Sequence, residues 1–307
     1  MAFVVSSLTD YVDQMSKELI QASHFEAKTA SLIPNIQSGI KASQAIQLLG
    51  VNAFPQADTA CGFVASGSTT FTQRNIVVGA IKYQDTLCPK TLRSKWTQTL
   101  LRPGSGDAES DLTFEADIAK GIVDLVNEQN ENRLWQGNTL STDPLLTAHE
   151  GLIKLIDAGS PVDGNTGSLT TWTSANAVAG MLAMVDALPA KLKGKSDLAI
   201  FCGTDFFDVY VTALLNKNWF HHDAATGNYE IKVPGKNVMI YGVHGLDGTN
   251  RMFGMRRENM YLGVDIQGEE ERFDMWYSKD DRNVKYDVAY KMGVQVAYTE
   301  ECVEFSF

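Results

Sequence analysis

Hydrophobic and polar residues follow a helical period between residues 107 and 137, which predicts one long helix. Asp107, Ser110, Asp111 and Thr113 offer N-cap side chains at its start, and Gly137 can end its last turn. A helix of this length spans roughly 40 Å. Its apolar arc is formed by Phe114, Ile118, Ala119, Ile122, Leu125, Val126 and Leu134.

The C-terminal part alternates between apolar and polar residues instead, which predicts β-structure. Residues 272–277 alternate first, and residues 278–283 form a polar turn. Alternation then continues over the fifteen residues 284–298, so we expect one very long strand, about 50 Å, that returns beside the first. A strand and a helix of similar length can pack along each other as two layers.

The N-terminal third gives a less regular pattern. Apolar periodicity predicts helices within residues 1–50, interrupted at Ile33-Pro34, and the small and polar residues 51–70 predict an extended connector. Residues 71–103 contain a strand-like run, a turn at Leu87-Cys88-Pro89 and a returning apolar segment, which predicts a long hairpin-like projection.

Residues 146–254 are expected to form a compact α+β module. Helices are predicted at 147–156, at 174–189 after the capping residue Ser174, and at 206–219. The apolar residues 198–202 predict a short strand between the last two helices.

Composition places the chain among globular proteins, with 307 residues, 44% of them hydrophobic and 21% charged. We expect no membrane span, no signal peptide and an intracellular location, since there is neither a long apolar run nor a basic and apolar leader. Four scattered cysteines suit reduced thiols rather than a zinc site. The net charge of −11 makes the chain a poor binder of nucleic acid phosphates.

Charge is unevenly divided between the predicted hairpin and the predicted helix. Residues 71–103 carry six bases and one acid, a net +5, whereas residues 107–133 carry eight acids and two bases, a net −6. The acidic face can be simply solvated, the two segments can pair within one chain, or the hairpin of one subunit can lie on the helix of the next. The third interpretation predicts these inter-subunit contact residues: Arg74, Lys82, Lys90, Arg93, Lys95, Asp117, Asp124, Glu128 and Glu131.

Candidate catalytic chemistry is sparse. His221, His222 and Asp223 are the best metal-ligand candidates, although adjacent residues in a loop rarely converge on one ion. No nucleotide-binding loop, nucleophile elbow or dinucleotide-binding glycine pattern follows an apolar strand. We therefore expect no cofactor and no enzymatic activity.

The order of these parts resembles the major capsid proteins of tailed bacteriophages, which have the Hong Kong 97-type fold. The resemblance is carried by the long helix ending in Trp135-Gln136-Gly137-Asn138, by residues 258–265 and by the long terminal hairpin. It implies an α+β fold with four parts. These are an N-terminal arm at 1–70, an extended E-loop hairpin at 71–106, a peripheral domain with the spine helix at 107–145 and 255–307, and an axial domain at 146–254.

The resemblance also implies a function. Proteins of this family assemble into pentamers and hexamers of an icosahedral shell around double-stranded DNA, without reading its sequence. Such a protein belongs to the virion, is assembled in the host cytoplasm, and has scaffolding, portal and decoration proteins as possible partners. A long charged pro-region is missing, which favours a separate scaffolding protein. The cross-linking residues of certain relatives cannot be matched to positions in this sequence.

Two other functions remain open at the level of sequence. The same fold can build an encapsulin-like cellular compartment that encloses a protein cargo. A soluble metal-dependent enzyme using His221, His222 and Asp223 is the hypothesis from a different class.

Overall fold

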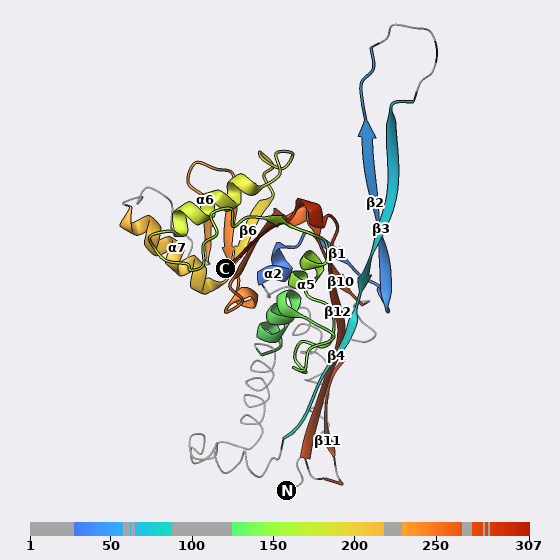
Figure 1. Ribbon diagram of the computed structural model, residues 1–307. Coiled ribbons are helices and arrows are strands. Elements are labelled where there is room, and N and C mark those ends of the chain that lie inside the picture. The colour runs from blue at the N-terminus through green and yellow to red at the C-terminus, as the bar shows by residue number, and fades with distance from the viewer. Residues whose placement is uncertain are drawn as a thin grey trace.

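A computed structural model describes residues 28–57, 62, 65–87, 125–217, 229–265, 272–278, 280, 281 and 283–307. Two packed modules and one projecting β-hairpin make up these residues, and Figure 1 shows the hairpin standing away from both modules. We name each module after its central strand, the β12 module and the β6 module.

The β12 module is built on a five-stranded sheet. Its long strand β12 (Asn283–Val296) pairs antiparallel with β11 (Arg272–Ser278), then with β10 (Met260–Val264), and along much of its length with β4 (Gly79–Leu87). The short strand β1 (Asn35–Gln37) pairs parallel with β10. The predicted terminal hairpin with one unusually long strand is thus confirmed, since β12 has 14 residues.

Helices cover this sheet. The described part of the predicted spine helix spans residues 125–136, and we call this part the spine helix; with α5 (Leu152–Asp157) and α2 (Lys28–Leu32) it lies beside the sheet in Figure 1. Leu134, Trp135, Leu152 and Ile156 are fully buried in one cluster with β12 side chains. Each such burial contributes about 1.5–3 kcal/mol. The helix ends just before Gly137, as predicted, and its predicted start lies outside the described residues.

The β6 module has a six-stranded sheet of order β5-β13-β9-β6-β8-β7, with α6 (Ala177–Ala187) and α7 (Thr204–Asn216) against it (Figure 1). Every residue of β6 is buried, because both faces of the sheet are covered. Its strands are β5 (Val162–Asp163), β6 (Leu198–Cys202), β7 (Glu230–Lys232), β8 (Met239–Gly242), β9 (Arg251–Arg256) and β13 (Val303–Ser306). In the described part of the chain three 3-10 turns join other elements: η1 (His244–Leu246), η2 (Arg257–Asn259) and η3 (Thr299–Glu301).

The helices and the strand predicted between residues 147 and 219 are present, but α5 begins at Leu152, five residues later than predicted. The predicted end of the last helix, at 218–219, lies outside the described residues. The boundary of the module needs a correction. Strand β13 was assigned by sequence to the peripheral domain, but it pairs with β9 and β5 inside the β6 sheet. Val303 and Phe305 are fully buried there, so burial of two apolar side chains holds the C-terminal strand in this module.

The projecting hairpin consists of β2 (Ser43–Ala53) and β3 (Gly67–Val77), which pair along their whole length. Two predictions are therefore wrong: residues 43–50 are not helical, and the hairpin does not lie at 71–106. Residues 79–87 pair with β12 instead, and residues 88–106 lie outside the described part. Ile46 and Leu48 are buried at a period of two, and the threonine-rich strand β3 supplies the partner that makes 43–53 a strand.

Gly79 marks a close contact between the start of β4 and the loop after the spine helix. A Cβ atom at this position would lie 1.7 Å from the carbonyl oxygen of Ala148. We expect Gly79→Ala to lower the free energy of unfolding by about 3 kcal/mol, because backbone on both sides must shift. The matched control is Gly167→Ala, where a Cβ meets only the Leu169 Cγ at 3.9 Å. Urea denaturation of both variants measures the difference, and equal losses would contradict this close packing.

Candidate assembly surfaces

The β2–β3 hairpin has two different faces, because directly opposite residues in an antiparallel pair point the same way. On the inner face Ile46, Leu48 and Ile76 are buried. They pack with Ile40, Val78 and Ala297 in a small separate cluster. This cluster fastens the base of the hairpin to the body of the protein.

The outer face of the hairpin exposes large apolar side chains. Leu49 lies directly opposite Phe71, and the two are 52% and 77% exposed. Val51 and Val77 on the same face are 65% and 60% exposed, and Phe54, just beyond β2, is 62% exposed. Contiguous apolar side chains of this size on one projecting face are typical of a surface that another molecule covers.

Charge is almost missing from the hairpin. Across residues 43–77 the sequence holds one acid, Asp58, and one base, Arg74. The Arg74 guanidinium donates a hydrogen bond to the hydroxyl of Thr299 at 3.0 Å, at the base of the hairpin. A contact made by the outer face is therefore apolar, and it differs from the charged contact that the sequence predicted.

Four of the predicted charged contact residues lie in the described part of the chain. Lys82 is exposed on β4, Glu128 is exposed on the spine helix, and Arg74 lies on β3. Glu131 is buried. The remaining five, Lys90, Arg93, Lys95, Asp117 and Asp124, lie outside the described residues.

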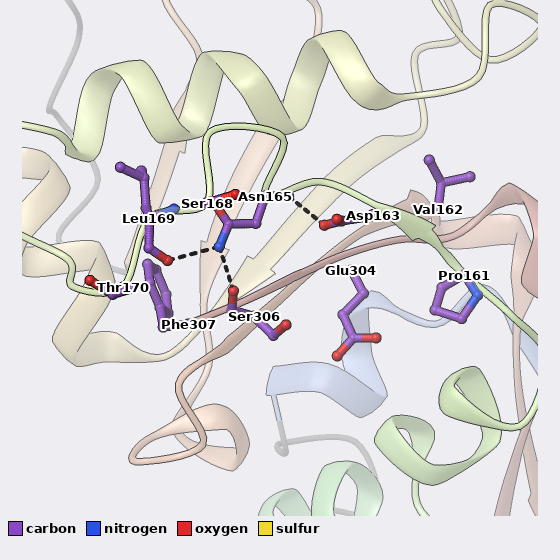
Figure 2. Close-up of a pocket in the computed structure, with 10 residues that line it drawn as sticks. All are labelled: Pro161, Val162, Asp163, Asn165, Ser168, Leu169, Thr170, Glu304, Ser306 and Phe307. Atoms are coloured by element: carbon purple, nitrogen blue, oxygen red, sulfur yellow. Dashed lines mark hydrogen bonds between the residues drawn. The ribbon is translucent and has the colours of Figure 1, made fainter.

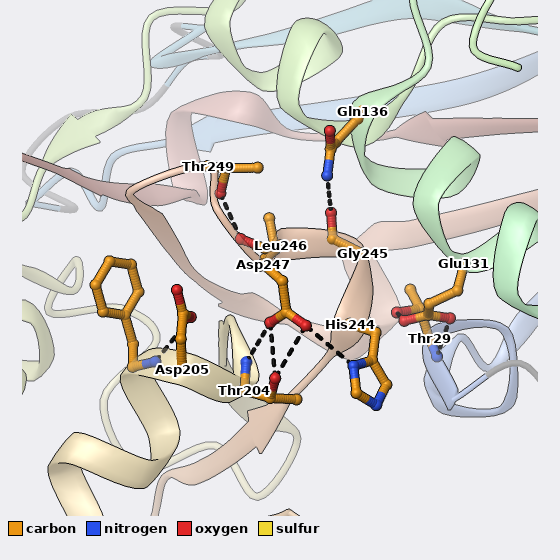
Figure 3. A network of polar contacts seen from close by, with 11 residues as sticks. Thr29, Glu131, Gln136, Thr204, Asp205, His244, Gly245, Leu246, Asp247 and Thr249 are labelled. Atoms are coloured by element: carbon orange, nitrogen blue, oxygen red, sulfur yellow. Dashed lines mark hydrogen bonds and ion pairs between the residues drawn. The ribbon is translucent and has the colours of Figure 1, made fainter.

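Glu131 is buried and hydrogen-bonded within its own chain, whereas the predicted inter-subunit contact needs an exposed side chain. Its side chain accepts a hydrogen bond from the Thr29 backbone N–H at 3.0 Å and another from the Thr29 hydroxyl (Figure 3). Trp135 Nε1 donates to the same hydroxyl at 2.8 Å. Burial raises the pKa of Glu131 above its ordinary value, opposed mainly by these hydrogen bonds. Helical spacing alone placed Glu131 on the polar arc, and the same spacing placed Leu125 on the apolar arc, although Leu125 is 47% exposed.

A second polar group that the sequence did not indicate lies between the spine helix and β4. The buried Arg133 donates to the backbone oxygen of Leu145 at 2.6 Å, to Asn130 Oδ1 at 3.0 Å and to the Tyr83 hydroxyl at 3.1 Å. His149 is also buried, and burial, aided by Arg133, lowers its pKa to about 4. The imidazole is therefore neutral at neutral pH.

One open pocket of about 420 Å³ lies beside β5 and the C-terminal residues (Figure 2). Its Asn165 side chain donates to the backbone oxygens of Leu169 at 2.8 Å and Ser306 at 2.7 Å, so it holds the loop in place. The lining residues include no nucleophile paired with a base.

The described residues hold neither a cluster of metal ligands nor a membrane-length apolar helix. No group of three histidine, cysteine or acidic side chains in this part of the chain is placed to hold a metal ion. Among the same residues no helix is long and apolar enough to cross a membrane. His221, His222 and Asp223 fall in an interval that the structure does not describe, so that site stays a prediction.

The sequence matches no family model and no curated protein. The structure, in contrast, is similar to solved structures over nearly its whole length. A chain of the satellite phage P4 procapsid, which includes the size determination protein Sid, aligns with a TM-score of 0.58 at 11% identity, covering 95% of this chain and 90% of that one. A chain of the cyanophage A-1(L) capsid aligns with a TM-score of 0.56 at 12% identity, covering 91% and 92%.

A third similar structure is the virus-like particle from Pyrococcus furiosus, with a TM-score of 0.53 at 10% identity over 95% of this chain and 98% of that one. At such identities the shared property is the fold. The chain therefore has the Hong Kong 97-type α+β fold of phage capsid proteins, as the sequence resemblance implied.

Proposed function

We propose that this protein is the major capsid protein of a tailed bacteriophage, with a structural and non-enzymatic role. Copies of the chain form the pentamers and hexamers of an icosahedral shell that encloses double-stranded DNA. The capsid fold supports this proposal, and one observation on this chain carries it: the β2–β3 hairpin projects from the body with an uncovered apolar face.

A two-stranded hairpin is only marginally stable in water unless something packs against it. Among the described residues, the buried contacts of this hairpin with its own chain are at its base. The occupant of the outer face is a second copy of the chain, because the hairpin reaches away from its own modules and because the similar structures are a procapsid, a capsid and a virus-like particle.

The chemistry of this contact is apolar. Covering the exposed part of the side chains of Leu49, Val51 and Phe71 contributes about 1–2 kcal/mol each. Charge contributes little along β2 and β3, since Arg74 is the one charged residue of the two strands. Salt screens charged contacts more than apolar ones. A shell held in this way should therefore tolerate high ionic strength.

The remaining partners follow from the same proposal. A net charge of −11 keeps the subunit from clamping the phosphates of the packaged DNA, and we expect no sequence-specific contact with the DNA. Scaffolding, portal and decoration proteins are the expected further partners. The protein is then a component of the virion, assembled in the host cytoplasm.

A cellular compartment shell is the second candidate, favoured by the similarity to the virus-like particle from Pyrococcus furiosus. The contents of purified particles distinguish a phage capsid from a cellular compartment shell. Double-stranded DNA inside particles from the native source supports the phage capsid, whereas a bound protein cargo without DNA supports the compartment.

Electron microscopy with size-exclusion chromatography at rising protein concentration tests the proposal. We expect shells, tubes or rings of five and six subunits, and the assembled fraction should change less than about twofold between 0.1 and 0.5 M salt. A chain that stays monomeric at every concentration, even with a scaffolding protein, would contradict the proposal. Assembly that dissolves in 0.5 M salt would instead favour the charged contact predicted from sequence.

A further inference from the structure

The short helix α2 connects two parts of the protein that are far apart in sequence. Its Thr29 is fully buried and makes the hydrogen bonds to Glu131 and Trp135 of the spine helix already described. Figure 3 shows Thr29 and Glu131 directed toward each other from α2 and the spine helix. Ala30 and Ile33 are buried in the shared core beside these contacts.

Lys28, at the start of α2, reaches the edge of the β6 module. Its ammonium group donates to the backbone oxygen of Tyr229 at 3.0 Å and lies 4.0 Å from a carboxylate oxygen of Glu230. It also lies 5.9 Å and 6.0 Å from the ring centres of Tyr229 and Tyr241, within the range of cation–π contacts. These residues belong to the edge strand β7 and its surroundings.

The spine helix touches the same edge directly at one further point. Gln136 donates to the backbone oxygen of Gly245 in η1 at 2.8 Å (Figure 3). A Cβ atom at Gly245 would lie 2.4 Å from Trp135 and 2.5 Å from the backbone oxygen of Glu131. Residues 229–246 and the spine helix therefore meet at a tight junction, with α2 lying on it.

A helix of five residues is not stable by itself. In the described part of the chain its position rests on Thr29, on Lys28 and on the apolar residues Ala30, Leu32 and Ile33, few enough to be released without unfolding a module. We propose that α2 is a releasable strap that keeps β7 and the β8–η1 turn seated on the spine helix. Release of α2 then loosens this edge of the β6 module, while the rest of both modules stays folded.

Hydrogen–deuterium exchange of the full-length unassembled subunit tests the strap, independently of whether the protein forms a capsid. Thr29→Val removes the hydroxyl and leaves Glu131 and Trp135 without one partner each. We expect exchange in residues 28–33 and 229–246 to become at least roughly tenfold faster, because a buried hydrogen-bond loss is worth about that factor. Exchange in β9 and α6 should stay within about twofold of the wild type.

Thr29→Ser is the matched control, since it keeps the hydroxyl and should exchange like the wild type in residues 229–246. If Thr29→Val does not fold, Lys28→Met provides the same test, because it keeps the aliphatic stem and removes the contacts with Tyr229 and Glu230. Faster exchange in 28–33 with no change in 229–246 would overturn the proposal. Equal acceleration in β9 and α6 would also overturn it, since α2 would then be part of the global core.

Discussion

The double variant Leu49→Ser, Phe71→Ser is expected to remain a folded subunit and to lose assembly. The two side chains are 52% and 77% exposed in the single chain, so their replacement should change the free energy of unfolding by about 1 kcal/mol, through loss of their cross-strand contact. In an assembly the neighbouring copy covers the exposed part of both side chains, and loss of that burial costs about 2–4 kcal/mol per hairpin. This cost weakens the contact by roughly 30-fold to 10³-fold.

Sedimentation velocity measures the assembled fraction, and circular dichroism shows whether the subunit is folded. The matched control is Gln47→Ser, Gln73→Ser, a directly opposite pair on the same face of the hairpin. Both glutamines are exposed and polar, so this variant should still assemble. Wild-type assembly by the Leu49 and Phe71 variant would show that the outer face is not the contact.

His149 should make the subunit less stable in acid. Its pKa of about 4 in the folded protein lies below the ordinary value of 6.5. The unfolded chain therefore binds the proton first as the pH falls, and the contribution of His149 to stability is complete above about pH 6.5 and lost by about pH 4. The loss amounts to about 2 kcal/mol at pH 5 and about 3 kcal/mol at pH 4.

Urea denaturation of the wild type and of His149→Leu, measured from pH 7.5 to pH 4, tests this prediction. Replacing the imidazole changes stability by an offset that does not depend on pH. As the pH falls across this range, the free energy of unfolding of the variant should therefore rise by about 3 kcal/mol relative to that of the wild type. Leu134→Val is the control, because Leu134 is fully buried and carries no titratable group. Its free energy of unfolding should differ from that of the wild type by the same amount at every pH. A constant difference for His149→Leu would mean that the imidazole titrates normally.

Elements with long, local patterns could be predicted from the sequence. The alternation of residues 284–298 and the polar turn before it identified β12 and its hairpin, and Gly137 identified the end of the spine helix. Strand β6 was predicted at its observed residues because five consecutive apolar residues between helices fit a strand with both faces covered.

The projecting hairpin could not be identified in the same way. The apolar pairs Ala45-Ile46 and Leu48-Leu49 fit both a helix and a strand, and the choice depends on pairing with β3, more than twenty residues away in sequence. The strand-like run after residue 71, the turn at Leu87-Cys88-Pro89 and the apolar segment that follows then suggested a hairpin in the wrong place. The sequence does not reveal the apolar outer face, because Leu49 and Phe71 become neighbours only through the pairing of β2 with β3.

The burial of single polar residues could also not be predicted from the sequence. Glu131 has a spacing typical of a solvated helix face, yet α2 covers it and Thr29 supplies its hydrogen bonds. His149 lies in a loop, where a histidine is usually exposed, and is buried where the start of β4 meets that loop. Both depend on contacts between segments distant in sequence.

An image reconstruction of assembled particles by electron cryomicroscopy tests the central claim most directly. The account predicts that the β2–β3 hairpin of each subunit crosses onto a neighbouring copy, with Leu49, Val51 and Phe71 covered by that neighbour. A shell in which these three side chains stay exposed to solvent, with subunits joined elsewhere, would contradict it.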